Sequence, residues 1–260
     1  MTTDQHATIS EDDGIITVTM DRQEKLNAIS PQMTETYWEA LGALAERDDL
    51  RCMVITAKGR YFSAGIDLSA GRRHDVPDSP QRGGRYRRNY RKHHLLYDEF
   101  EAVEKPIIQA VQGICLGAGV EMAMSCDFRF CTPNAEFRLP EVNIGLLPGS
   151  GGASRLTRLI GPVWGKWMAM AGMPVGAEQA KTIGLVNDIY PEETFMDDVY
   201  AFCRHIMKIP VDVLGISKLA VDMYADVQDR TVQRHIDRIV NTTLNGKPEH
   251  LAATARFQKK

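Results

Sequence analysis

Apolar strand-like runs that end in glycine-bearing turns and lead into helices constrain the fold of this chain more than any other feature. Residues 52–56 form such a run and enter the loop 58–68, which carries glycines. Residues 106–111 form another, which passes through the turn 113–119 into an apolar helix starting near Val120. Strands and helices that alternate at this length form crossover units. The sequence therefore predicts an α/β fold with a largely parallel sheet.

The two ends of the chain differ in pattern. Residues 6–10 and 15–20 are predicted to be strands joined by the turn-forming run 11–14. Ser30 and Pro31 supply an N-cap and a proline at the first helical position, which predicts a helix from residue 32 to about 45. After about residue 175 the pattern turns mostly helical.

Composition and charge exclude several classes of protein. The chain has 260 residues, of which 43% are hydrophobic and 25% charged, as in ordinary globular domains. A formal charge of -3 gives no overall attraction to nucleic acid or to an anionic membrane. No apolar run approaches the roughly 20 residues of a membrane helix, and the polar first ten residues lack the apolar region of a signal peptide. We therefore predict a protein that does not enter the membrane.

The five cysteines have neither the spacing of a metal site nor an even number. Most of them lie within or just after apolar stretches, which favours buried, reduced thiols over disulfides or zinc ligands. The sequence thus predicts a cytoplasmic protein with no metal site.

Three segments carry the residues suited to chemistry: 61–68, the Gly117–Gly119 turn with its helix, and 139–152. Small residues after a strand let backbone approach a ligand closely, and N–H groups at a helix start attract negative charge. Two such turns facing each other could donate two N–H groups to one carbonyl oxygen. This arrangement is an oxyanion hole, in which one donor contributes roughly 3–4 kcal/mol of transition-state stabilisation.

Two glutamates stand in these segments. Glu121 lies in an otherwise apolar helix, and Glu141 lies in a loop rich in glycine and proline. Carboxylates that converge on one pocket can share proton transfer, because their environments split their pKa values. Each feature alone has a simpler interpretation. The glycine turns could serve packing, Glu121 could interact favourably with the helix dipole, and Glu141 could be a solvated loop residue. The residues by themselves indicate a possible site but no reaction.

At these positions the sequence resembles the crotonase superfamily, the enoyl-CoA hydratases and isomerases. The matching segments cover nearly the whole chain: residues 25–28, 62–68, 105–106, 113–127, 140–152, 155–156 and 180–186. The resemblance implies a crotonase-like spiral of repeated ββα units, here 1–195, followed by a helical C-terminal subdomain, 196–260, used in trimer contacts. It also implies a homotrimer or a dimer of trimers.

The resemblance also assigns the binding residues of an acyl-CoA thioester. The oxyanion hole falls on the backbone N–H groups of Ile66 and Ala118, where alanine replaces a glycine common in the family. The residues implied to contact substrate or coenzyme A are Lys25, Leu26, Ala28, Ala64, Gly65, Asp67, Leu68 and Gly117. Coenzyme A enters as part of the substrate, so no separate cofactor is expected.

Both glutamate positions of the family's hydratases are occupied. By resemblance, Glu141 handles the proton at the α-carbon and Glu121 orients or activates the water added at the β-carbon. The pair favours an enoyl-CoA hydratase that adds water to a 2-enoyl-CoA. An isomerase needs only the carboxylate that matches Glu141 and remains the runner-up, and a crotonase-type acyl-CoA hydrolase or lyase stays open. Dienoyl-CoA isomerases carry an aspartate where Gly149 stands, which argues against that activity.

Two segments depart from the family pattern. Residues 69–92 match nothing, although this stretch lines the acyl pocket in the family. Residues 255–260 lack the usual lysine-rich helix end in register, so a lysine that binds the CoA phosphate is not carried over.

The unmatched segment contains a basic run interleaved with Tyr86 and Tyr90. Its cations are Arg82, Arg85, Arg87, Arg88, Arg91 and Lys92. Such a run could bind RNA through phosphates and stacking. The favoured interpretation is a solvated helical face that pairs with Asp98, Glu99, Glu101 and Glu104, or a lid near the CoA phosphates. A non-catalytic acyl-CoA-binding protein is a third alternative, against which both glutamates argue.

Overall fold

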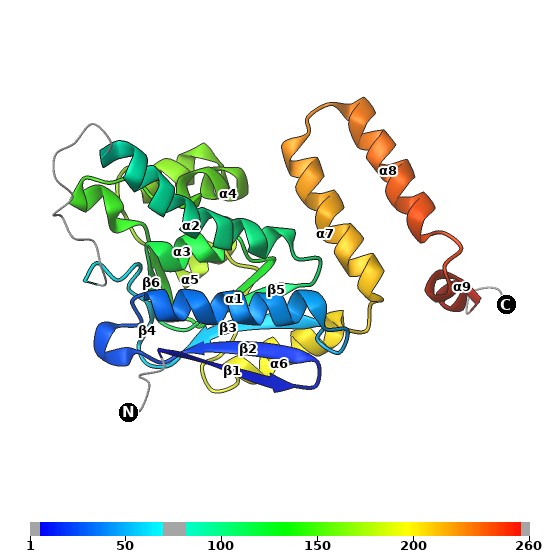
Figure 1. Cartoon of the computed structure of the whole chain (residues 1–260), viewed down its shortest axis with the longest axis horizontal. Helices are drawn as coiled ribbons and strands as arrows, with labels where there is room; N and C mark the ends of the chain where they lie inside the picture. The colour runs from blue at the N-terminus through cyan, green and yellow to red at the C-terminus, as the bar shows by residue number, and fades with distance from the viewer. Residues whose placement is uncertain (1–5, 70–81, 256–260) are drawn as a thin grey trace.

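A six-stranded sheet forms the centre of the computed structural model, which describes residues 6–69 and 82–255 (Figure 1). Its strand order is β1-β2-β3-β5-β7-β10. Only the first pair is antiparallel, and every later pair is parallel. The bounds are β1 (Ala7–Asp12), β2 (Ile15–Met20), β3 (Cys52–Ala57), β5 (Ile107–Val111), β7 (Phe128–Cys131) and β10 (Asp188–Ile189). The predicted α/β fold with a largely parallel sheet is confirmed.

A second, four-stranded sheet has the order β4-β6-β8-β9. Its strands are β4 (Tyr61–Ser63), β6 (Ile114–Leu116), β8 (Glu136–Arg138) and β9 (Val175–Gly176). Each of β3, β5 and β7 is followed by one short strand of this second sheet and then by a helix. This repeated strand–strand–helix unit is the ββα repeat that the resemblance implies.

Helices cover both faces of the larger sheet. They are α1 (Pro31–Glu46), α2 (Arg82–Ala102), α3 (Ala118–Ala123), α4 (Gly152–Ala169), α5 (Ala177–Thr182) and α6 (Phe195–Ile206), with 3-10 turns η1 (Gln23–Lys25) and η2 (Pro140–Ile144). The main core contains Met33, Tyr37 and Leu41 of α1 and Phe100 of α2. A separate cluster packs α6 against the opposite face, through β2, β3, β5 and β7.

The helix predicted near residue 32 begins as its sequence indicates. Ser30 caps α1, because its side-chain oxygen accepts a hydrogen bond from the Met33 N–H at 3.2 Å. The first hairpin is longer than predicted. The ladder extends to the pair Asp12 and Ile15, so the turn contains only Asp13 and Gly14, both with positive φ.

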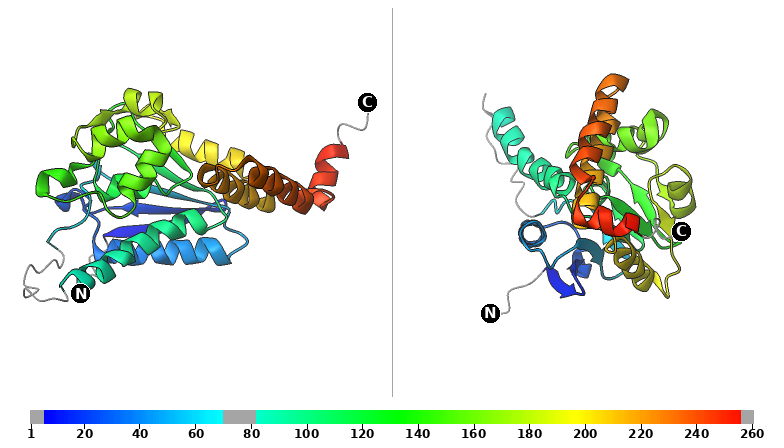
Figure 2. Two further views of the ribbon diagram at one scale, coloured as in Figure 1. Left: turned by 90° about the horizontal axis from the view of Figure 1, so that it is seen from above. Right: turned by 90° about the vertical axis from the view of Figure 1, so that its right-hand side faces the viewer.

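Three further helices, α7 (Val211–Asp226), α8 (Arg230–Leu244) and α9 (Pro248–Ala255), extend away from the sheets as a C-terminal arm (Figure 2). Lys218 of α7 anchors the arm: its Nζ donates to the Phe100 carbonyl at 2.8 Å and to Asp127 at 3.1 Å. The division of the chain after residue 195 stays a prediction, and α6, which starts there, packs on the sheet.

Candidate active site

The ends of β4 and β6 bring together the two turns predicted to bind a carbonyl oxygen. These strands are parallel neighbours, so their carboxyl ends meet at one edge of the smaller sheet. The loop with Gly65 and Ile66 follows β4, and Gly117 and Ala118 follow β6. A β-carbon placed on Gly65 would lie 3.4 Å from the Ala118 nitrogen. The backbones of the two turns are therefore in close contact.

Both predicted donor amides point away from their own segments. Ile66 forms a parallel bridge with Ile29, which bonds the Gly65 carbonyl at 2.8 Å and the Asp67 N–H at 3.0 Å. In such a bridge the N–H of the residue between faces the other side. Ala118 is the first residue of α3, and N–H groups in the first turn of a helix have no partner within it. That the two amides bind one thioester oxygen stays a prediction.

Glu121 is buried one turn into α3, with 4% of its surface exposed. Its Oε1 accepts hydrogen bonds from the Ser150 N–H at 2.8 Å and from the Gly152 N–H at 3.2 Å. Burial raises the pKa of this carboxyl to about 7, and the charge of Glu141 adds to the increase. The two backbone donors lower the pKa and thus oppose that shift. Glu121 can therefore gain and lose a proton near neutral pH.

Glu141 lies in η2 and reaches back to the turn after β6. A β-carbon on Gly117 would lie 2.7 Å from the Glu141 Oε1, so a side chain at residue 117 would push the carboxylate out of its present position. Burial raises the pKa of Glu141 as well. Its Oε2 is buried, and no group of the described residues donates a hydrogen bond to it. This oxygen is suited to exchange a proton with a bound molecule.

The structure thus brings both predicted carboxylates to the turn that carries Ala118. Glu121 comes from the helix that this turn begins, and Glu141 comes from a loop 20 residues further along the chain. Their electrostatic coupling shows in the pKa of Glu121, which the charge of Glu141 raises. Two coupled acids beside backbone donors form a site for proton transfer next to a carbonyl group.

The loops implied to contact coenzyme A are bonded to each other. The Ala64 N–H donates to the Leu26 carbonyl at 2.9 Å, and Ser63 Oγ donates to the Asn27 carbonyl at 2.9 Å. Leu26 and Asn27 both have positive φ. Ala28 is half-buried, while Lys25 and Leu68 are exposed at the surface of these loops.

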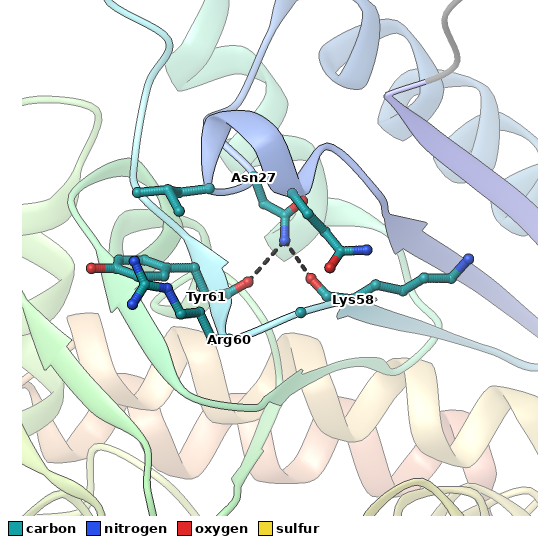
Figure 3. A pocket seen from close by; sticks show the side chains of 7 residues that line it. Asn27, Lys58, Arg60 and Tyr61 are labelled. Atoms are coloured by element: carbon teal, nitrogen blue, oxygen red, sulfur yellow. Dashed lines mark hydrogen bonds between the residues drawn. The ribbon is translucent and has the colours of Figure 1, made fainter.

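The Asn27 side chain fixes this junction. Its Nδ2 donates to the carbonyls of Lys58 and Tyr61, both at 2.8 Å, and its Oδ1 accepts from the Arg22 N–H at 2.8 Å (Figure 3). Asn27, Lys58 and Tyr61 border a small pocket of about 230 Å³ whose lining also includes Gln23, Leu26, Gly59 and Arg60. The tight turn of the loop therefore depends on a buried amide.

Asp67 has structural partners in the described structure. It accepts hydrogen bonds from the Ser69 hydroxyl at 2.6 Å and from Arg22 Nη1 at 2.5 Å. These bonds hold the pKa of Asp67 well below its usual range against the effect of burial. The side chain thereby holds the loop after β4 against the loop after β2, and its predicted contact with coenzyme A stays a prediction.

Sequence reasoning missed several residues that build the site: Arg22, Ser63, Asn27, Tyr97 and Arg155. Tyr97 of α2 donates its hydroxyl to the Ala118 carbonyl at 3.1 Å, which anchors the start of α3. Asn27 and Arg155 stand inside matching segments, so their positions were available, but no local pattern indicates their partners. Most of the partners are distant in sequence, and the nearer ones are backbone groups of Arg22 and Ser150, so only the tertiary fold shows the full set of bonds.

The basic run lies in α2, and most of its side chains are outside the described residues. Arg88 and Arg91 are exposed. Asp98 and Glu101, which we expected to pair with this run, form ion pairs with Arg155 and Arg158 of α4. The C-terminal segment 256–260 also lies outside the described residues.

All five cysteines are buried, as predicted from their apolar surroundings, and none of them forms a disulfide. Within residues 6–69 and 82–255, no cluster of three or more histidine, cysteine, aspartate or glutamate side chains could hold a metal ion. Over the same residues, no helix combines the length and the apolar character needed to cross a membrane.

A family model described as enoyl-CoA hydratase/isomerase matches residues 10–258. A crotonyl-CoA hydratase of Syntrophomonas wolfei is 30% identical over 234 residues, which are 90% of this chain and 85% of that protein. The fatty acid oxidation complex subunit alpha of Idiomarina loihiensis is 33% identical over 214 residues, but this chain spans only 29% of its length. The crystal structure of an enoyl-CoA hydratase from Thermoplasma volcanium superposes with a TM-score of 0.87 at 26% identity, covering 98% of both chains.

The chain therefore belongs to the enoyl-CoA hydratase/isomerase family of the crotonase superfamily. Its α/β core and helical C-terminal region are those of the crotonase fold. It is an acyl-CoA enzyme of this family's general class.

Proposed function

We propose that this chain is an enoyl-CoA hydratase that adds water across the double bond of a 2-enoyl-CoA thioester. One observation carries the proposal: the buried carboxylate of Glu121 and the half-buried carboxylate of Glu141 lie beside the turn that carries the Ala118 amide, and the charge of Glu141 raises the pKa of Glu121. The N–H groups of Ile66 and Ala118 would bind the thioester oxygen, where negative charge develops as the enolate forms.

The proposed reaction needs both glutamates. As the water oxygen bonds to the β-carbon, the Glu121 carboxylate takes one proton of that water. The electrons of the double bond move towards the thioester oxygen, where the two backbone amides stabilise them. Glu141 then delivers a proton to the α-carbon. One water molecule is added in total, and the two carboxyls regain their starting state by exchanging a proton between them or with solvent.

The surroundings of each carboxyl favour this division of work. A pKa of about 7 for Glu121 gives a carboxylate that is a stronger base than an exposed glutamate and is still largely ionised just above neutral pH. Burial raises the pKa of Glu141, which makes proton exchange easier than at an exposed glutamate, and the buried Oε2 has no other hydrogen-bond partner among the described residues. Glutamates in such environments commonly act as general acids and bases.

Coenzyme A would lie along the joined loops after β2 and β4. Backbone at Leu26, Ala28, Ala64 and Leu68 is the proposed contact surface, together with Lys25, whose exposed side chain can approach a phosphate. The hydrogen bonds between these loops support this surface, because they order it before a ligand arrives. No resident cofactor is needed for this chemistry.

An isomerase that moves a double bond between the 3- and 2-positions is the second candidate. The free Oε2 of Glu141 favours it, since one carboxyl can remove a proton at one carbon and return it at another. The Glu121 carboxylate would then have no chemical step.

Mass spectrometry separates the two candidates. We expect the purified chain to convert crotonyl-CoA to a product heavier by one water, whereas isomerisation of a 3-enoyl-CoA leaves the mass unchanged and moves the double bond. Glu141→Gln and Glu121→Gln should each lower the kcat of hydration by about 10²- to 10⁴-fold while CoA thioesters still bind. The exposed Glu39→Gln is the matched control and should keep full activity. Full hydratase activity in either site variant would refute the mechanism.

A further inference from the structure

Arg155, near the start of α4, connects the site to α2. Only 10% of its side chain is exposed. Nη2 pairs with Asp98 at 2.5 Å and with Glu101 at 2.8 Å, both on α2, and Nη1 donates to the Ser150 carbonyl at 3.2 Å. One guanidinium thus joins two acids of a long helix to the loop that precedes α4.

Gly151 is shaped to accept this guanidinium. Its φ is +90°, and a β-carbon at this position would lie 1.9 Å from Arg155 Nη1. A side chain at residue 151 would be strained at this φ and would displace the guanidinium from its place over the 150–152 backbone. The backbone of this loop and the arginine are therefore fitted to each other.

This burial is unfavourable for stability taken by itself. The Nε of Arg155 is buried and bonds no group among the described residues. Burial disfavours the charged guanidinium, and although the ion pairs with Glu101 and Asp98 outweigh this effect and raise the pKa of Arg155, the unsatisfied Nε donor still costs free energy. Positions where a local rule is broken in this way are often tied to function.

The loop that Arg155 holds is the loop that binds Glu121. The Ser150 and Gly152 N–H groups both donate to Oε1 of that carboxylate, at 2.8 and 3.2 Å. Arg155 bonds the carbonyl between these two donors, and no bond joins it to Glu121 among the described contacts. Its influence on the carboxylate must therefore pass through the backbone of residues 150–152.

We propose that Arg155 is a positioning residue: its guanidinium, held by Asp98 and Glu101, fixes the 150–152 backbone so that two N–H groups stay on the Glu121 carboxylate. The inference rests on the proposed function, in which that carboxylate activates water. It adds a residue that touches neither the substrate nor the reacting atoms.

A pH profile reveals such a role. The two backbone hydrogen bonds lower the pKa of Glu121, while burial and the facing charge of Glu141 raise it. Without Arg155 the loop can turn its N–H groups away, and the raising effects of burial and of Glu141 are then opposed less. The pKa then rises from about 7, so the carboxylate is protonated at a pH where the native enzyme is active. The acidic limb of the rate profile should move to higher pH.

The test compares Arg155→Met with Arg158→Met across pH 5.5 to 9.5, with crotonyl-CoA as substrate. Arg158 also pairs with Glu101, at 3.0 Å, and with Asp226, at 3.2 Å, but makes no bond to residues 150–152. We expect Arg155→Met to lower kcat about 10- to 100-fold at pH 7 and to move the acidic limb of kcat upward by about 0.5 pH unit or more, with KM changed less than about threefold. Arg158→Met should leave the limb in place.

An acidic limb at the native pH in a folded Arg155→Met variant would overturn the positioning role, as would an equal shift in Arg158→Met. If circular dichroism shows that Arg155→Met does not fold, Arg155→Lys replaces it. Lysine keeps a positive charge near Asp98 and Glu101 but lacks a second nitrogen that could bond the Ser150 carbonyl. The acidic limb of Arg155→Lys should therefore move to higher pH as in Arg155→Met. An acidic limb at the native pH would overturn the inference. The proposed hydratase function is tested separately, because an unchanged kcat in Glu121→Gln refutes the hydratase mechanism. If Glu121→Gln is inactive but the acidic limb of the Arg155 variant is not shifted, only the role of Arg155 is refuted.

Discussion

The edge of the smaller sheet and the C-terminal arm are stabilised in different ways. At the sheet edge, Asn27, Asp67 and Glu121 are buried and bonded to backbone or side chains far away in sequence. In the arm, α8 buries only Ile236 and exposes Ile239 at 67% and Val232 at 43%. Its helix start is capped locally by Asp229, whose carboxylate accepts from the Thr231 N–H at 2.7 Å.

This difference shows where the fold places its long-range constraints. Buried polar side chains at the sheet edge specify one backbone geometry, because each would lose several hydrogen bonds in any other. The arm relies on local helix signals, on the buried Gly215 and Ala220 of α7, and on the ion pair of Lys218 with Asp127. Substitutions at the sheet edge should therefore change stability and activity together, and those on α8 should change little within one chain.

The largest effect expected on stability concerns the buried carboxylate. Burial raises the folded-state pKa of Glu121 from its ordinary value near 4.5 to about 7, so folded chains bind more protons than unfolded ones between these values. Stability contributed by the protonated group is complete below about pH 4.5 and is lost as pH rises through 7. The free energy of unfolding, measured with urea, should therefore be higher for Glu121→Gln than for the native chain at pH 8, by on the order of 3 kcal/mol. At pH 5 the two free energies of unfolding should differ little.

The exposed Glu39→Gln serves as the control for this pH dependence and should stay within about 0.5 kcal/mol of the native chain at both pH values. If the free energy of unfolding depended on pH equally in the native chain and in Glu121→Gln, the pKa of Glu121 would not be raised in the folded state.

A smaller effect is expected where the coenzyme loops join. Asn27→Ala leaves the buried carbonyls of Lys58 and Tyr61 without their donor, which should lower the free energy of unfolding by about 2 kcal/mol. Because the loop backbone loosens, KM for crotonyl-CoA should rise more than kcat falls. Gln23→Ala, which removes an exposed side chain from the same loop, is the matched control and should be nearly neutral. A stable Asn27→Ala variant with native KM would contradict the role of this amide.

The smallest effect is expected on the arm. Ile239→Ser should change the unfolding free energy of a single chain by less than about 0.5 kcal/mol, since most of this side chain is already exposed. Ile16→Ala, at a fully buried position of β2, should cost about 2–5 kcal/mol. The homotrimer or dimer of trimers that the resemblance implies adds a second measurement: sedimentation that shows dissociation of Ile239→Ser would place α8 at a contact between copies. If Ile239→Ser lost much of its unfolding free energy at every protein concentration, the C-terminal arm would not differ from the sheet edge in how it is stabilised.

Much of the fold was predictable from local pattern. The run of apolar residues in β3 and β5 indicated buried parallel strands, and Ser30 with Pro31 located the start of α1. These signals are short-range, because a cap or a strand run carries its physical cause within a few residues. The predicted end of β1 at residue 10 was too early, because pairing with β2 extended a strand whose polar end resembles a turn.

The site was predictable in part. Glu121 and Glu141 were named from the resemblance, and the structure places both at the same turn. Most partners of Arg155 and Asn27 were not predictable, since Asp98, Glu101, Lys58 and Tyr61 each lie more than 30 residues away, and the nearer partners are backbone groups with no side-chain signal. Residues 70–81, part of the stretch 69–92 that lines the acyl pocket in the family, lie outside the described residues.

By itself the sequence determined which segments become strands and helices, and where flexible glycine turns permit backbone to approach a ligand. Tertiary structure alone decided that the turn after β4 lies against the turn after β6, that Glu141 reaches Gly117, and that Glu121 is buried deeply enough to titrate near pH 7. The physical reason is that a local pattern fixes backbone dihedrals, whereas a pKa and a donor–acceptor geometry depend on groups brought together from distant parts of the chain.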